Sequence, residues 1–74
     1  MKIIIAGTGK VGRSVAAVLS EEGHDVTVID LDSETIALVS NDLDVICAEG
    51  NAADPEVLRS VGAGKADLVV AVTE

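Results

Sequence analysis

The sequence predicts an α/β fold, a Rossmann-like doubly wound parallel sheet truncated to four strands with three helices. Two observations support this prediction. Four short runs rich in β-branched residues alternate with three segments of helical periodicity, and such alternation indicates crossover units. The runs are apolar nearly throughout, as expected for strands that helices cover on both faces. We expect the strand order 3-2-1-4 of the first part of a dinucleotide-binding fold.

The first two strands and the helix between them are predicted from the N-terminal part of the chain. Residues Lys2–Ala6 and Asp25–Asp30 form the strands, and residues 11–22 form the helix. Gly23 stands where glycine commonly follows the end of a helix. The spacing places four apolar residues on the inner face of this helix: Val11, Val15, Val18 and Leu19.

A second helix and a third strand follow. Residues 34–41 have apolar side chains at helical spacing, and either Asp32 or Ser33 can cap the start of this helix. The β-branched residues between Asp44 and Ala48 predict the third strand. Cys47 lies in that strand, where we expect it to behave as a small buried hydrophobe.

The third helix is expected to be short, and the fourth strand closes the sequence. Asp54 is a good N-cap, and Pro55 suits the first helical position. Residues Asp67–Thr73 form the fourth strand, which would be an exposed apolar edge. We therefore expect residues 1–74 to be one domain that is the N-terminal fragment of a larger domain, or that pairs with another chain.

Composition excludes several classes of protein. The 74 residues contain 5 basic and 13 acidic side chains, a net charge of −8, which argues against nucleic-acid binding and against electrostatic docking on a membrane. No apolar run approaches the length of a membrane span, so we expect no membrane insertion. One cysteine and one histidine cannot form a disulfide or a structural zinc site. We expect a cytoplasmic domain.

Residues Gly7–Gly12 read G-x-G-x-x-G between the first strand and the first helix, the context that the dinucleotide-binding motif requires. Gly7 makes the tight turn, Gly9 lets a pyrophosphate approach the backbone, and Gly12 allows close packing of helix on strand. The helix N-terminus then faces the phosphates. The predicted contacts in this segment are Gly7, Thr8, Gly9, Lys10, Val11 and Gly12.

The acid expected to bind the ribose is Asp30, 18 residues beyond Gly12 at the end of the second strand. Its carboxylate would accept hydrogen bonds from the ribose hydroxyls and repel a 2′-phosphate, which disfavours NADP. Leu31 and Asp32 are predicted contacts beside it. Asp32 would strengthen the repulsion, although it is equally suited to cap the next helix.

Two further segments are expected to border the ligand. In the turn from Glu49 to Pro55, Asn51 and Ala52 are predicted contacts, because small residues leave room for a flat base and an amide can bond its edge. Residues 71–73 border the switch point between the first and fourth strands, where ligands of this fold bind. Thr73 is the predicted contact there.

The residues resemble a known family, the RCK or KTN nucleotide-binding domain of the regulatory proteins of Trk-type potassium uptake. The resemblance covers nearly the whole chain and is carried by the segments 1–12, 19–26, 28–32, 50–55 and 66–73. This chain differs from the family pattern after the third strand. The family commonly has Gly-Asp-Ala-Thr there, and this chain has Gly50-Asn51-Ala52-Ala53. That departure puts specific contacts carried over to Asn51 and Ala53 in doubt.

The resemblance implies a regulator rather than an enzyme. Such domains bind NAD(H) or an adenine nucleotide (ATP, ADP or AMP), form homo-oligomers, and sit at the cytoplasmic face of the cell membrane on an integral-membrane potassium transporter subunit, whose ion flow they gate. The glycine motif also occurs in dehydrogenases, so the alternative function is the cofactor-binding half of an NAD-dependent dehydrogenase. A third alternative is a structural fragment that binds nothing.

Overall fold

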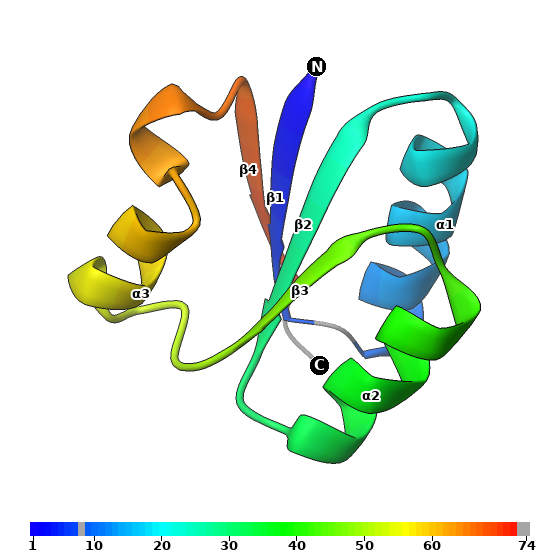
Figure 1. Ribbon diagram of the computed structural model, residues 1–74, viewed down its shortest axis with the longest axis horizontal. Helices are drawn as coiled ribbons and strands as arrows, with labels where there is room; N and C mark the ends of the chain where they lie inside the picture. The colour runs from blue at the N-terminus through cyan, green and yellow to red at the C-terminus, as the bar shows by residue number, and fades with distance from the viewer. Residues whose placement is uncertain (8, 73–74) are drawn as a thin grey trace.

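The computed structural model describes residues 1–7 and 9–72 of the chain. Strands and helices alternate along it as predicted (Figure 1). The elements are β1 (Lys2–Ala6), α1 (Lys10–Glu21), β2 (Asp25–Asp30), α2 (Ser33–Asp42), β3 (Ile46–Glu49), α3 (Pro55–Ser60), the 3₁₀ turn η1 (Ala63–Lys65) and β4 (Leu68–Ala71). None of the helices in these residues is long and apolar enough to cross a bilayer.

The four strands form one parallel sheet in the order β3-β2-β1-β4, which confirms the predicted fold and strand order. Ile4 of β1 pairs with Thr27 of β2 on one side and with Val69 of β4 on the other. All four carboxyl ends therefore lie at one edge of the sheet. The chain builds outward from β1 to β3 and then returns to the other side of β1, so a topological switch point lies between β1 and β4, where ligands of open α/β sheets bind.

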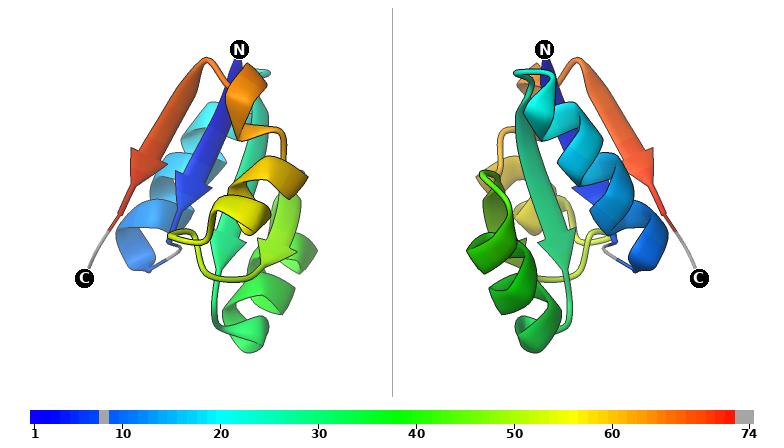
Figure 2. Two further views of the ribbon diagram at one scale, coloured as in Figure 1. Left: turned by 90° about the vertical axis from the view of Figure 1, so that its left-hand side faces the viewer. Right: turned by 90° about the vertical axis from the view of Figure 1, so that its right-hand side faces the viewer.

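Helices α1 and α2 cover one face of the sheet, and α3 covers the other (Figures 1 and 2). The core cluster lies on the α1–α2 face and contains Ile3, Ile5, Ala16, Val26, Val28 and Val39, each at most 2% exposed. Leu43 and Val45 pack against this cluster from the loop after α2. Residues 44 and 45 belong to this loop. Strand β3 therefore begins two residues later than the predicted Asp44, and it continues to Glu49.

The inner face of α1 differs in part from the prediction, since Val15 and Leu19 pack against the core cluster as expected but Val11 and Val18 do not. Gly12 and Ala16 are buried, whereas Val11 is 61% exposed and Val18 is 54% exposed. A Cβ on Gly12 would lie 2.6 Å from the carbonyl oxygen of Gly7, so the helix crosses the end of β1 too closely for a larger residue. The small residues make the contact, and two of the valines are turned away.

The prediction that all strands are buried on both faces holds for β1 and β2 only. Ile3, Ile4 and Ile5 are at most 1% exposed. On the outer strands, Ile46, Leu68 and Val69 are 59%, 46% and 49% exposed. Each outer strand has one neighbouring strand in the described chain, and the six residues of α3 leave much of their face of the sheet uncovered.

Side-chain caps fix the starts of the other two helices as predicted. The carboxylates of Asp32 and Asp54 accept hydrogen bonds from the backbone N–H groups of Glu34 and Glu56, at 3.0 and 2.9 Å. Asp32, and not Ser33, is the N-cap of α2. Each cap stabilises its helix by about 1 kcal/mol, and each also sets where its helix starts beside the carboxyl edge of the sheet.

Candidate functional site at the carboxyl edge of the sheet

A cavity of about 470 Å³ lies at the carboxyl edge of the sheet, on the side of α3. Its volume falls within the usual range for small-ligand pockets. Three sources contribute its wall: the ends of three strands, the loop between β3 and α3, and one residue of α3. The lining residues are Ala6, Gly7, Asp30, Leu31, Gly50, Asn51, Ala52, Ala53, Leu58, Val69, Ala71 and Val72.

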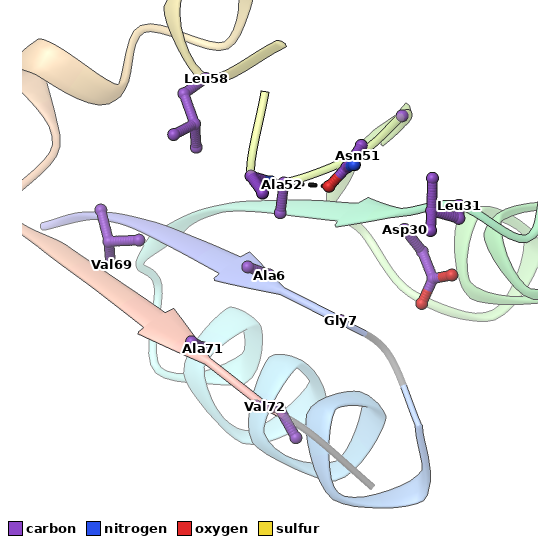
Figure 3. A pocket seen from close by; sticks show the side chains of 12 residues that line it. Ala6, Gly7, Asp30, Leu31, Asn51, Ala52, Leu58, Val69, Ala71 and Val72 are labelled. Carbon is purple, nitrogen blue, oxygen red and sulfur yellow. Dashed lines mark hydrogen bonds between the residues drawn. The ribbon is translucent and has the colours of Figure 1, made fainter. Parts of the chain in front are cut away.

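The cavity has a polar end and an apolar end (Figure 3). Asp30 and Leu31 lie at one end, and Val69, Ala71 and Val72 lie at the other, with Gly7 between them (Figure 3). This arrangement suits an elongated ligand that has a hydroxylated group beside Asp30 and apolar parts along the rest of the wall. A nucleotide has that chemistry, and its phosphates would lie toward the turn after β1.

Gly7 closes the turn at the end of β1 in a conformation that glycine adopts easily, with φ of +95°. Its N–H donates to the carbonyl oxygen of Ile29 at 2.8 Å. A Cβ at this position would collide with the carbonyl oxygen of Val72. Gly7 therefore lets the end of β1 lie close to both neighbouring strands at the switch point.

The start of α1 has the features expected of a phosphate-binding helix end. Its N-cap is Gly9, which supplies no side-chain hydrogen bond to the helix, and the first turn contains no acidic residue. Lys10 and Val11 are exposed at this end. Within residues 1–7 and 9–72, the cavity wall does not include Gly9, Lys10, Val11 or Gly12, so their contacts remain predictions. Thr8 lies outside the described residues.

Asp30 and Asp32 differ in what their carboxylates do. Asp30 is half-buried at the cavity, and its Oδ1 accepts the Asp32 N–H at 2.8 Å. In Asp32, Oδ1 accepts the Glu34 N–H at 3.0 Å and Oδ2 accepts the Thr35 hydroxyl at 2.9 Å. Both oxygens of Asp32 thus serve the first turn of α2. Asp32 is therefore the helix cap, and of these two acids it is Asp30 that lies on the described cavity wall.

The loop between β3 and α3 is shaped by Asn51. Its Oδ1 accepts the Ala53 N–H at 2.8 Å, and its carbonyl oxygen accepts the Asp54 N–H at 2.9 Å. These bonds leave the side-chain NH₂ as the group that Asn51 can offer to a ligand. Ala52 lines the cavity next to it. The structure therefore brings Asn51 and Ala52 to the same cavity as Asp30.

Three lining residues lie outside every segment that was expected to border the ligand: Ala6, Leu58 and Val69. The sequence contains a signal for two of them. Leu58 is an apolar residue on the inner face of the short third helix, and Val69 alternates with Ala71, so both point to the same face of β4. Ala71 and Val72 line the cavity as the switch-point argument requires, and the predicted contact Thr73 lies outside the described residues.

Cys47 is not part of this site. It packs against the core cluster on the α1–α2 face. Burial raises the pKa of its thiol, and a hydrogen bond with Ser40 opposes that rise. Among the described residues, no group of three or more His, Cys, Asp or Glu side chains could hold a metal ion. The chemistry that these residues offer at the cavity is binding by hydrogen bonds, glycine turns and apolar contact.

The family model of the TrkA-N domain matches residues 3–74. The chain belongs to the TrkA-N domain family. This membership confirms the resemblance found in the sequence. Among curated relatives, the domain is 42% identical over 73 residues to the Trk system potassium uptake protein TrkA of Haemophilus influenzae. It is 45% identical over 73 residues to the TrkA homolog of Archaeoglobus fulgidus.

The TrkA-N domain described here covers only part of its relatives. The matches span 99% of this chain but 16% of each of those two proteins. Among solved structures, the domain is similar to one described as Shewanella denitrificans Kef CTD in AMP bound form. That match has a TM-score of 0.78 and 30% identity, and it covers 93% of this chain and 40% of the other.

Proposed function

We propose that this TrkA-N domain binds an adenine nucleotide, either NAD(H) or one of ATP, ADP and AMP, in the cavity at the carboxyl edge of its sheet. The observation that carries the proposal is the position of Asp30 on that cavity, across from the switch point of the sheet. The glycine turn at Gly7 and the uncapped start of α1 supply the place for phosphates. The similarity to a structure described as AMP-bound supports the same ligand class.

The residues that would hold the nucleotide have distinct tasks. Asp30 would accept hydrogen bonds from the ribose hydroxyls, and Leu31 would cover one face of the base. The Asn51 amide would bond the edge of the base beside Ala52, and the first turn of α1 would hold the phosphates. The glycine motif carries five further proposed contacts: Thr8, Gly9, Lys10, Val11 and Gly12. Thr73 stays a proposed contact because it follows the strand that borders the switch point.

The wider role that we infer is regulation of potassium transport. The curated relatives are named as Trk potassium uptake proteins, and the one ionisable side chain of the described cavity wall, Asp30, is the one that we assign to the ribose. We infer a regulatory, non-enzymatic domain of a homo-oligomer, located in the cytoplasm on an integral-membrane transporter subunit. Nucleotide exchange would gate ion flow if two nucleotides differ in their affinities for two conformations.

The binding proposal is tested by calorimetric titration of the chain with AMP, ADP, ATP, NAD and NADH. We expect at least one of them to bind, and the substitution Asp30→Asn to weaken that binding by about 1–3 kcal/mol, the range for a hydrogen bond to a charged group. Asparagine retains an oxygen that can accept the Asp32 N–H, so the turn is preserved. Asp25→Asn, at the opposite end of β2, is the matched control and should leave the affinity unchanged.

The same titration includes NADP, because the Asp30 carboxylate would repel its 2′-phosphate. We expect NADP to bind more weakly than NAD, and Asp30→Asn to reduce that difference. Equal loss of affinity in the Asp30 and Asp25 variants would refute the ribose assignment. Absence of binding by all of the nucleotides would refute the nucleotide proposal for this chain.

The regulatory role is tested in a longer relative. Residues 1–74 would replace the matching segment of the Haemophilus influenzae protein, and potassium uptake would be measured in cells lacking the native regulator. We expect uptake to be restored, and the Asp30→Asn chimaera to lose its dependence on nucleotide while it accumulates to the same level. A chimaera that oxidises or reduces a small substrate with NAD would instead support the dehydrogenase alternative.

A further inference from the structure

The amide of Asn51 is held in one orientation on the wall of the cavity. Its Oδ1 accepts the Ala53 N–H at 2.8 Å (Figure 3). An oxygen is required at this position, because the NH₂ group of an amide donates hydrogen bonds and does not accept them from a backbone N–H. The bond therefore fixes which end of the amide is oxygen, and it turns the nitrogen away from the Ala53 backbone.

Hydrogen bonds within the loop engage the oxygens of Asn51 and leave its side-chain nitrogen. The carbonyl oxygen of Asn51 accepts the Asp54 N–H at 2.9 Å. Among residues 1–7 and 9–72, Nδ2 of Asn51 has no hydrogen-bond partner. Asn51 is an exposed residue of the cavity wall, so a ligand can reach this nitrogen. Toward a ligand, Asn51 is therefore mainly a donor with two N–H groups.

The loop between β3 and α3 offers the cavity one polar side chain, that of Asn51. The other residues that this loop places on the wall are Gly50, Ala52 and Ala53, none of which has a polar side chain. Asp54, the acidic residue of the loop, caps α3 and is not part of the described cavity wall. A base that lies against this loop therefore meets an amide donor and no carboxylate from it.

A donor at the edge of the base distinguishes two kinds of purine. Adenine presents N7 as an acceptor and its 6-amino group as a donor, whereas guanine presents O6 and N7, which are both acceptors. Hypoxanthine has the same O6 and N7 as guanine. An amide NH₂ can donate to N7 of any of these bases and to O6 of the last two. It meets the 6-amino group of adenine donor to donor, so that group gains nothing from it.

We propose that Asn51 makes this site accept 6-oxopurine nucleotides, those of hypoxanthine and guanine, at least as well as adenine nucleotides. The inference rests on the proposed nucleotide site and names the bases that the site takes. Asp30 does not oppose it, because the ribose hydroxyls are the same in all of these nucleotides. Leu31 and Leu58 offer only apolar contact, which does not distinguish a 6-oxo from a 6-amino group. Selection among purines therefore falls to Asn51.

The test is calorimetric titration of the 74-residue chain with matched pairs of nucleotides: AMP with IMP, ADP with IDP, and ATP with ITP. The members of a pair differ only at C6 and N1 of the purine. We expect the inosine member to bind at least as tightly as the adenine member. An adenine nucleotide that binds clearly more tightly than its inosine counterpart overturns this inference and leaves the nucleotide proposal intact. Absence of binding by every member refutes both.

The substitution Asn51→Asp tests whether the amide is the cause. Aspartate retains an oxygen that accepts the Ala53 N–H, so the loop is preserved. Its carboxylate presents only acceptors, which bond the 6-amino group of adenine and repel O6. We expect the ratio of affinities within a pair to shift toward the adenine member by about tenfold. The added negative charge weakens both members alike, because they carry the same phosphates, and it cancels from the ratio.

Asn41→Asp is the matched control. It adds the same charge at an exposed position near the end of α2, away from the described cavity wall, and it should leave the ratio unchanged. Far-UV circular dichroism checks that both variants fold. A ratio that Asn51→Asp leaves unchanged, or that both substitutions change equally, overturns the assignment of base selection to Asn51.

Discussion

The two faces of the sheet differ in how well they are covered. On the α1–α2 face, six apolar residues that are at most 2% exposed form one cluster, which partly buried residues of α1, α2 and β3 extend. On the α3 face, Ile4 and Ile29 are buried, but none of the six residues of α3 is. The cavity of about 470 Å³ lies on this second face, at its carboxyl edge.

This difference in cover assigns stability mainly to the α1–α2 face and ligand binding to the α3 face. The continuous cluster on the first face supplies most of the apolar burial, and in a chain of 74 residues that burial has little margin. The second face is left open enough to accept a ligand. Sites are commonly placed on the less stable part of a fold because they need room and freedom to close.

The largest expected effect comes from comparing the same substitution on the two faces. Ile5→Ala removes a side chain that is fully buried under α1, and we expect it to lower the free energy of unfolding by about 2–5 kcal/mol. Ile46→Ala, on the α3 face and 59% exposed, should cost less than about 1 kcal/mol. Urea unfolding followed by far-UV circular dichroism measures both. Similar losses would show that the α3 face is packed as firmly as the other.

Two glycines with similar backbone angles sharpen the comparison between the site and the opposite edge of the sheet. Gly7 and Gly23 have φ of +95° and +87°. A Cβ at Gly23 meets nothing within 4 Å, whereas at Gly7 it meets the Val72 carbonyl oxygen. Gly23→Ala should lower the free energy of unfolding by about 1 kcal/mol through backbone strain. Gly7→Ala should lower it clearly more, because the steric collision adds to the strain. Thermal melts of the two variants test this, and equal melting temperatures would contradict it.

The smallest expected effect distinguishes the two acids after β2. Asp32 caps a helix on the well-covered face, so Asp32→Ala should lower the free energy of unfolding by about 1 kcal/mol. Its effect on nucleotide affinity should be smaller than that of Asp30→Asn, because both oxygens of Asp32 already serve α2. Urea unfolding and calorimetry on each variant separate the two roles. A larger affinity loss at Asp32 would make it the principal ribose acid.

Local rules made much of the fold predictable. The alternation of strand and helix patterns predicted a parallel sheet in the order 3-2-1-4, and the structure has it. Asp54 and Pro55 marked the start of α3 because capping depends on neighbouring residues alone. The glycine motif and the spacing to Asp30 predicted which edge of the sheet carries the site, because both depend on the connection between adjacent elements.

Helix faces and strand exposure depend on contacts between distant parts of the chain, and they were not predictable in the same way. Hydrophobic periodicity identified the amphipathic helix 11–22. It placed Val11 and Val18 on the inner face because both are apolar. The close crossing of α1 over the end of β1 placed Gly12 and Ala16 at the centre of the inner face, and a Cβ on Gly12 would collide with the Gly7 carbonyl. Likewise, the apolar run of β3 predicted burial on both faces, and its edge position and the short α3 left Ile46 exposed. Strand β4 is exposed, as its expected edge position implies.

The sequence by itself determined the elements, their order, the Asp54 cap of α3 and the edge of the sheet at which a nucleotide would bind, since each of these is set by residues that are neighbours along the chain. Only the tertiary structure decided that Leu58 and Val69 complete the cavity wall with Asp30, and that Val11 and Val18 remain on the surface. The physical reason is that packing depends on distances between elements far apart in sequence, which no local pattern contains.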